Sequence, residues 1–173
     1  MKYEFSSRIF PIAAMASVAS VLQILEIFYV LPLPFLKIGL ANGIILFMLF
    51  KGLFLEAILV NLIRILAGGF FSGKIFSLPF VYSFSGGMTS TLIMLIIVYF
   101  FKKNLSVFPI SIAGAITHNL TQLYLVTLTF NTGSIPTNMV NFTYIFSIIT
   151  GLIVGYFTNS LLKLEIEISI KKN

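Results

Sequence analysis

Long apolar stretches, separated only by short segments rich in glycine, proline, lysine or asparagine, dominate this sequence. Of its 173 residues, 58% are hydrophobic and only 9% are charged, whereas a soluble domain carries about 25% charged residues. So few charged side chains cannot cover a soluble domain of this length, and so apolar a chain is not disordered. A helix crosses the roughly 30 Å hydrocarbon core with about 20 residues. The sequence therefore predicts an all-α integral membrane protein that forms a six-transmembrane-helix bundle.

The predicted spans form one transmembrane domain over residues 1–173, with little chain left for a domain outside the membrane. The first stretch is longer than the 7–15 residues of a signal-peptide core, so we expect a retained helix. Gly68-Gly69 is expected to end the third span, and residues 163–173 are expected to form a tail. The predicted spans are about 9–30, 38–50, 53–67, 80–101, 107–130 and 139–162.

The distribution of lysine and arginine predicts the orientation in the membrane. With six spans both termini share a side, which holds eight cations, whereas the other side holds three. Cytoplasmic loops carry the excess of Lys and Arg, so we expect a cell-membrane protein with both termini in the cytoplasm. In so apolar a chain, a net charge of +6 indicates loops that face anionic membrane lipid rather than a nucleic-acid partner. The two groups are Lys2, Arg8, Lys51, Lys102, Lys103, Lys163, Lys171 and Lys172, against Lys37, Arg64 and Lys74.

Several residue types needed for catalysis are missing from the sequence. It has no cysteine, no aspartate and a single histidine, His118, which excludes thiolate and multi-histidine metal sites and aspartate-rich magnesium–diphosphate sites. Gly68 and Gly73-Lys74 match the start of a P-loop, but Ile75 stands where Ser or Thr would bind magnesium. We therefore expect no enzyme activity, no catalytic residue, no metal and no cofactor, and energy for any transport would come from partner subunits.

Polar side chains inside a span are costly, so each one is a hypothesis about function. The direction of the spans places most of them in the outer half of the membrane, where cations and neutral donors gather. Gly114, His118 and Gln122 share one helix face at a spacing of four residues. We predict that this set binds a small, anionic substrate from the outer side. The predicted substrate-binding residues are Lys37, Asn42, Arg64, His118, Asn119 and Gln122.

Each of these residues also has a structural interpretation. His118 and its neighbours could form hydrogen bonds between helices. Arg64 lies near a span end and could extend to the outer headgroups. Glu26 could neutralise Arg64 or Lys37.

Small residues form a stripe on the first predicted span. They are spaced i, i+3, i+4 and i+7, so they share a face that suits close helix packing. The stripe could pack within the bundle or against another subunit, and we predict a partner interface there. Its members are Ala13, Ala16, Ser17 and Ser20.

Four strings, taken in order, carry a resemblance to a known family. They are Lys37-Ile38-Gly39-Leu40-Ala41-Asn42, Arg64-xxx-Gly68, Ser85-Gly86-Gly87, and Gly114-Ala115-xx-His118-Asn119-xx-Gln122. Together they resemble the Gx transporter family, whose members are often labelled heptaprenyl diphosphate synthase component I. That family is similar to the substrate-binding S components of energy-coupling factor (ECF) transporters.

The resemblance implies an S-component-like fold with six helices, cytoplasmic termini and a pocket that opens outward. It also implies that a small-residue face on the first helix docks a transmembrane coupling subunit driven by two ATPases. The leading hypothesis is therefore a substrate-capture subunit of an uptake transporter. The alternative is a membrane accessory subunit for polyprenyl diphosphate or quinone synthesis, although a chain without aspartate cannot be the catalytic synthase.

Overall fold

The computed structural model describes residues 2–28, 38–102, 104–131 and 135–172. Within these ranges the chain is all-helical, with six helices and no strand, which confirms the all-α part of the predicted fold class. The helices are α1 (Lys2–Phe28), α2 (Leu40–Phe50), α3 (Phe54–Phe71), α4 (Leu78–Phe101), α5 (Val107–Thr129) and α6 (Thr137–Lys172).

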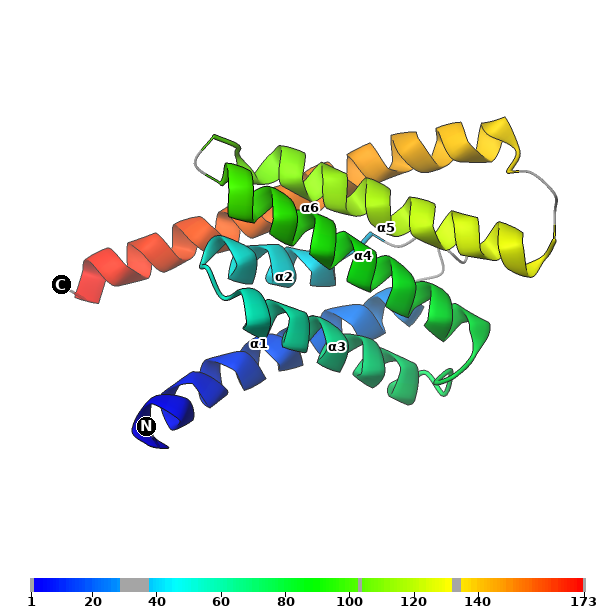
Figure 1. Ribbon diagram of the computed structural model, residues 1–173. Helices are drawn as coiled ribbons and strands as arrows, with labels where there is room; N and C mark the ends of the chain where they lie inside the picture. The colour runs from blue at the N-terminus through cyan, green and yellow to red at the C-terminus, as the bar shows by residue number, and fades with distance from the viewer. Residues whose placement is uncertain (1, 29–37, 103, 132–134, 173) are drawn as a thin grey trace.

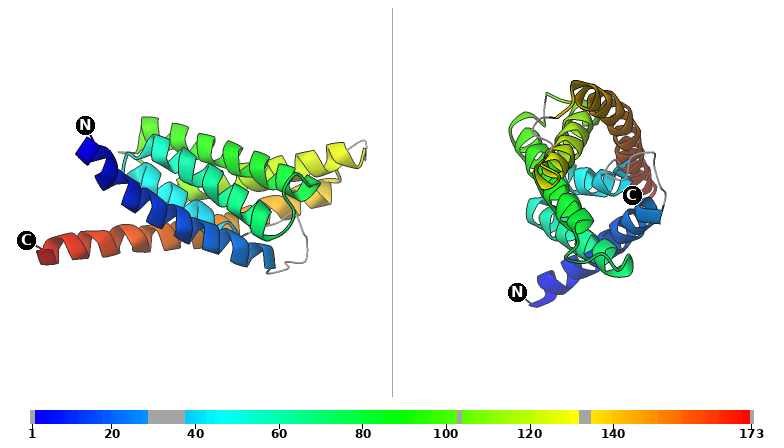
Figure 2. Two further views of the ribbon diagram at one scale, coloured as in Figure 1. Left: turned by 90° about the horizontal axis from the view of Figure 1, so that it is seen from below. Right: turned by 90° about the vertical axis from the view of Figure 1, so that its right-hand side faces the viewer.

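Consecutive helices run in opposite directions along the bundle (Figure 1). Both termini consequently lie at one end, together with the α2–α3 and α4–α5 connections, as the second view also shows (Figure 2). We call this the terminal end and the other the opposite end. An up-and-down bundle of this kind has the topology that the cation distribution requires.

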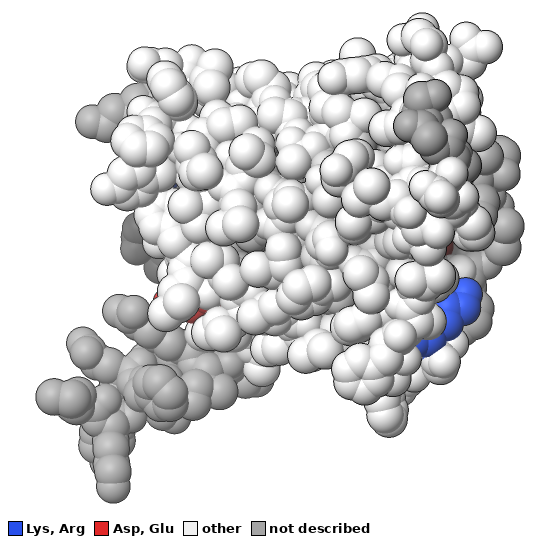
Figure 3. Space-filling model, turned by 45° about the vertical axis from the view of Figure 1, so that its right-hand side comes forward, with Lys and Arg blue, Asp and Glu red and all other residues white. Residues whose placement is uncertain are grey.

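Three helices are long and apolar enough to cross a membrane, judged over the described residues: Phe54–Phe71, Leu78–Phe101 and Thr137–Glu165. Ile12–Ile27 and Leu40–Phe50 are apolar but shorter. The described surface agrees with contact with lipid, because large hydrophobic side chains such as Phe70, Phe76 and Tyr156 are exposed and the described part of one face is almost without charge (Figure 3). Exposed apolar surface of this extent marks a membrane or partner contact.

The short helix α2 lies at the centre of the bundle. It has 11 residues, or about 16 Å at 1.5 Å per residue, and it contacts each of the other five helices. Its sequence is apolar on every side except at Asn42, as expected of a helix buried all round. Because α2 is shorter than its neighbours and lies towards the terminal end, its first turn begins inside the bundle (Figure 1).

The third helix does not end at Gly68-Gly69 as predicted but continues to Phe71. A Cβ atom at Gly68 would lie 2.8 Å from Cγ of Gln23, and one at Gly69 would lie 2.6 Å from Cδ2 of Phe80. The two glycines therefore let α1 and α4 approach α3 closely. Their role is packing, not helix termination.

Both terminal helices are also longer than predicted. Helix α1 begins at Lys2 and passes through Pro11, and α6 continues through the predicted tail to Lys172. No glycine or proline follows Gly155 to stop α6, and Lys51 at the α2–α3 turn pairs with Glu165 at 2.7 Å. At about 1.5 Å per residue, α6 is longer than the bundle and extends beyond its terminal end (Figure 2).

The small residues of α6 serve internal packing. A Cβ atom at Gly151 would lie 2.6 Å from Cα of Ile112, and one at Gly155 would lie 3.0 Å from Cδ1 of Phe108. Helix α5 therefore lies directly on the α6 backbone at these positions. This close contact places the polar side chains of α5 in the interior of the bundle.

Candidate binding site

The guanidinium group of Arg64 lies at the junction of three helices. It is only 2% exposed and donates to three side-chain amides: Nη1 to Gln23 Oε1 (2.7 Å), Nη2 to Asn42 Oδ1 (2.5 Å), and both Nε (3.0 Å) and Nη2 (2.6 Å) to Asn61 Oδ1. These contacts join α1, α2 and α3. Arg64 therefore does not extend to the membrane surface, and its direct hydrogen-bond partners are neutral amides.

The chemistry of Arg64 also determines which way each amide faces. Arginine only donates hydrogen bonds, so all three amide oxygens must face it and the three NH₂ groups must face away. Gln23 Nε2 then donates to Ser83 Oγ at 3.3 Å, and Asn61 Nδ2 donates to the Gly87 carbonyl at 3.2 Å. Two of the amides thus extend the network to α4, while the third, Asn42, turns its nitrogen towards α5.

A second polar group lies on α5. His118, Asn119 and Gln122 are all buried, and the Nε2 atoms of Gln122 and His118 lie 3.1 Å apart. A Cβ atom at Gly86 would lie 2.9 Å from the His118 carbonyl oxygen. Glycine at this position therefore lets α4 approach the polar face of α5.

Asn119 is held by α6. Its Nδ2 atom donates to Ser147 Oγ at 3.0 Å, and Ser147 Oγ in turn donates to the Thr143 carbonyl at 2.6 Å. While the single hydroxyl proton of Ser147 is used in that second bond, Ser147 accepts from Asn119. The nitrogen of Asn119 consequently faces Ser147, and Oδ1 faces elsewhere.

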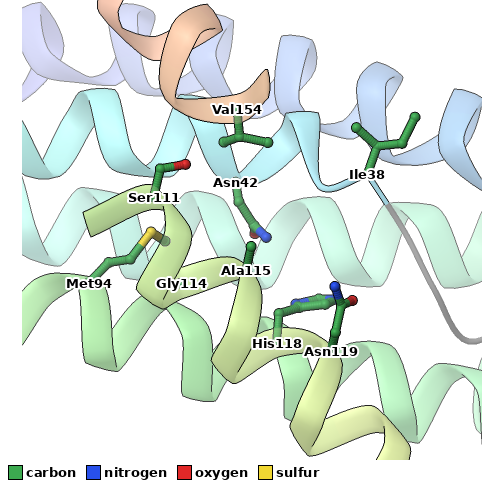
Figure 4. A pocket seen from close by; sticks show the side chains of 9 residues that line it. All are labelled: Ile38, Asn42, Met94, Ser111, Gly114, Ala115, His118, Asn119 and Val154. Carbon is green, nitrogen blue, oxygen red and sulfur yellow. The ribbon is translucent and has the colours of Figure 1, made fainter. Parts of the chain in front are cut away.

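A small cavity separates the two polar groups (Figure 4). It has room for about one water molecule. The lining residues are Ile38, Asn42, Met94, Ser111, Gly114, Ala115, His118, Asn119 and Val154.

Some polar atoms at and beside this cavity have no hydrogen-bond partner among the described residues. Asn119 Oδ1 and Ser111 Oγ belong to lining residues, and Gln122 Oε1 lies one helical turn further along α5. Buried polar atoms are almost always paired with protein or ordered water. Their grouping on α5 therefore marks the place where a polar occupant would be stabilised.

Glu26 lies at the start of α2. Its Oε1 atom accepts from the Leu40 N–H at 2.5 Å, and its charge also acts on Arg64. A carboxylate at a helix N-terminus is favourable because the free N–H groups and the helix dipole attract negative charge. Glu26 therefore has a structural role at the end of α2 that faces the cavity.

The structure separates the predicted binding residues into three groups. Asn42, His118 and Asn119 line the cavity, Gln122 contacts His118 beside it, and Arg64 lies behind Asn42. Lys37 is outside the described residues. Within those residues no group of three His, Cys, Asp or Glu side chains is placed to hold a metal.

Sequence reasoning missed Gln23, Ser111 and Ser147. Each is a polar side chain in an apolar stretch and is buried in the structure. The cost of polar groups in a membrane was the signal that could have identified them. Gln23 in particular lies 41 residues from Arg64, so the pairing itself cannot be read from local spacing.

The predicted partner stripe on α1 divides into two faces. Ala16 is buried in the hydrophobic core together with Ala19, whereas Ala13 and Ser17 are exposed and Ser20 is half-buried. Helix α1 packs on α2 and α3. Part of the stripe therefore packs within the bundle, and part remains on the surface.

Two comparisons, with curated proteins and with solved structures, returned no match for this chain. The family model described as heptaprenyl diphosphate synthase component I matches residues 15–161. This match covers α2 to α5 in full, parts of α1 and α6, and both polar groups described above, so the chain belongs to the heptaprenyl diphosphate synthase component I family.

Proposed function

We propose that the protein is an S-component-like substrate-capture subunit of an uptake transporter. The chain passes through the membrane six times, with the short helix α2 enclosed within the bundle; the terminal end faces the cytoplasm, and a small ligand enters from the opposite end. The alternating helix directions and the three long apolar helices support this arrangement. Transport itself depends on partner subunits.

One observation carries the proposal: the cavity at the start of α2 is lined by polar side chains whose orientation the protein fixes. Arg64 holds Asn42, and Ser147 holds Asn119. Interhelical hydrogen bonding alone explains the amides that bond on both sides, Gln23 and Asn61. It does not explain Asn119, whose oxygen is buried without a partner beside the cavity.

In this proposal Asn42, His118, Asn119 and Gln122 contact the ligand. Arg64 acts through Asn42, because four hydrogen bonds to amide oxygens already hold its guanidinium group. The cavity is small, so a ligand larger than water needs the lining side chains to move. Met94 is suited to such movement because its unbranched side chain is adaptable.

Native mass spectrometry of protein purified in mild detergent tests the proposal. A co-purifying small molecule should be present in the wild type and absent in Asn119→Leu. Thr121→Val is the matched control, because it removes a hydroxyl that bonds Thr89 between α4 and α5 away from the cavity. If all three samples carry the same bound species, or the wild type carries none, the capture function fails.

The family description favours a second candidate. It names a synthase component, which supports a membrane accessory subunit for polyprenyl diphosphate synthesis. The two functions differ in their partners: capture requires a transmembrane coupling subunit and ATPases, and the accessory role requires a soluble prenyl synthase. Affinity purification from the native membrane, followed by identification of the co-purifying chains, distinguishes the two functions.

A further inference from the structure

Two side-chain amides that line the cavity give it a hydrogen-bond donor and an acceptor of defined polarity. Asn42 is held with its oxygen on Arg64 (2.5 Å from Nη2), so its N–H groups face away from α3. Asn119 is held with its nitrogen on Ser147 (3.0 Å), so its oxygen faces away from α6. Both residues line the same cavity from two different helices, α2 and α5, and Figure 4 shows Asn42 extending towards α5.

Neither amide can reverse without loss. If Asn42 rotated by 180°, its NH₂ group would face a guanidinium that has only donors. If Asn119 rotated, its oxygen would face the Ser147 hydroxyl oxygen unless that hydroxyl gave up its bond to the Thr143 carbonyl. Reversal therefore puts donors face to face at Asn42 and costs a buried hydrogen bond at Ser147, and both changes are unfavourable. The donor on α2 and the acceptor on α5 are therefore properties of the folded protein.

Asn119 gives the cavity an acceptor without a partner. Asn119 is 1% exposed, and its Oδ1 atom has no hydrogen-bond partner in the part of the chain that the structure describes. A carboxylate or fully ionised phosphate has only acceptors. It would accept a hydrogen bond from Asn42 but place a second acceptor against the oxygen of Asn119. A group that carries an acceptor and a donor side by side satisfies both.

On this basis, and resting on the proposed capture function, we infer that the cavity binds the amide-like edge of a neutral ligand. The carbonyl oxygen of a carboxamide, lactam or ureide accepts from Asn42, and its adjacent N–H donates to Asn119. Arg64 is a positioning residue in this arrangement. Its charge orients Asn42 and does not pair with the ligand, which differs from the anionic ligand expected from the sequence.

Three probes of nearly the same shape test this inference: formamide, which has one acceptor and one donor; formate, which has acceptors only; and formamidinium, which has donors only. Each has three heavy atoms, so affinities no tighter than about millimolar are expected. Saturation-transfer NMR of the purified full-length protein in detergent, with titration of each probe, gives the order of affinity. The wild type should bind formamide at least about fivefold more tightly than formate or formamidinium. Formate would place an acceptor against the oxygen of Asn119, and formamidinium would place a donor against the NH₂ group of Asn42.

Asn42→Asp replaces the donor that α2 presents to the cavity with an acceptor. The introduced carboxylate would pair with Arg64 through one oxygen and present the other to the cavity, so this variant should prefer formamidinium over formamide. Asn119→Leu removes the acceptor and should abolish the preference for formamide over formate; it tests the inference if Asn42→Asp does not fold. Thr121→Val should keep the wild-type order.

Three results would overturn the inference. If formate binds best to the wild type, the cavity is an anion site. If the order of affinity is unchanged in a folded Asn42→Asp protein, Asn42 does not contact the ligand. If no probe binds saturably, the cavity holds only a water molecule. The co-purifying species in native mass spectrometry separates these failures from failure of the capture function. A cellular ligand that lacks an amide-like group would leave capture intact and the amide inference wrong.

Discussion

The Nη2 atom of Arg64 donates to the Oδ1 atom of Asn42 at 2.5 Å, and this contact links the buried guanidinium group to the cavity. On one side of it, Gln23 and Asn61 complete the binding of the guanidinium group. On the other side, Asn42 lines the cavity that His118 and Asn119 also line. A residue that stabilises four helices thereby also orients a side chain of the candidate site.

Replacing Arg64 should destabilise the protein. In Arg64→Leu the oxygens of Gln23, Asn42 and Asn61 lose their donor and stay buried, so we expect a loss of about 2–4 kcal/mol in the free energy of unfolding. Arg64→Lys should be intermediate, because a lysine cannot reproduce the planar fork that reaches three acceptors. Thermal unfolding in detergent measures this, with the exposed Lys74→Met as control. Wild-type stability in Arg64→Leu would contradict the hydrogen-bond network.

The two glycines that contact α5 and α4 should differ in their tolerance of alanine. At Gly151 the added Cβ would lie 2.6 Å from the backbone Cα of Ile112, whereas at Gly114 it would meet the Met94 side chain at a similar distance. A methionine can change rotamer, but a packed backbone cannot. We therefore expect Gly151→Ala to lose about 1–3 kcal/mol and Gly114→Ala clearly less. Melting curves of the two variants measure the difference. A larger loss of stability in Gly114→Ala than in Gly151→Ala would be inconsistent with this packing.

The divided stripe on α1 leads to a pair of contrasting substitutions. Ala16 belongs to the hydrophobic core, so Ala16→Leu should overpack the bundle and lower its melting temperature. Ser17 is exposed, so Ser17→Leu should fold normally and weaken complex formation with a coupling subunit. Co-purification and melting curves of both variants measure this. An intact complex in Ser17→Leu would remove the proposed interface from this face.

The sequence was sufficient to predict the helical class and the approximate place of each helix, because uninterrupted apolar length is a strong signal. The predicted end of the third span at Gly68-Gly69 was wrong, because a glycine pair indicates a helix end when the neighbouring helix is unknown. In the structure Gln23 occupies the space that a Cβ atom at Gly68 would fill. The sequence identified Asn42, Arg64 and Asn119 as costly polar residues but not their partners. Those partners are set by helix packing between residues 22 to 41 positions apart.

Single cysteines should report the topology, since the chain has none of its own. Asn131 follows the end of α5, which lies at the opposite end, and Asn104 lies in the α4–α5 connection at the terminal end; both are exposed. If the chain passes through the membrane six times with cytoplasmic termini, Asn131→Cys should react with an impermeant thiol reagent in whole cells and Asn104→Cys only after permeabilisation. Labelling of Asn104→Cys in intact cells would contradict this orientation.

The hydroxyl group of Ser147 should determine how well the cavity distinguishes ligands. In Ser147→Ala the nitrogen of Asn119 loses its acceptor, so the amide can rotate and present either its oxygen or its NH₂ group to the cavity. Formamide and formate should then bind with similar affinity, a loss of the roughly fivefold or greater preference expected in the wild type. Ser160→Ala is the matched control, because Ser160 on the same helix donates only to the carbonyl four residues earlier, as Ser147 does to Thr143. Saturation-transfer titrations give the ratio of affinities, and melting curves confirm that both variants fold. A preference that persists in Ser147→Ala would show that Asn119 is not oriented by Ser147, and the acceptor assigned to α5 would have to be reassigned.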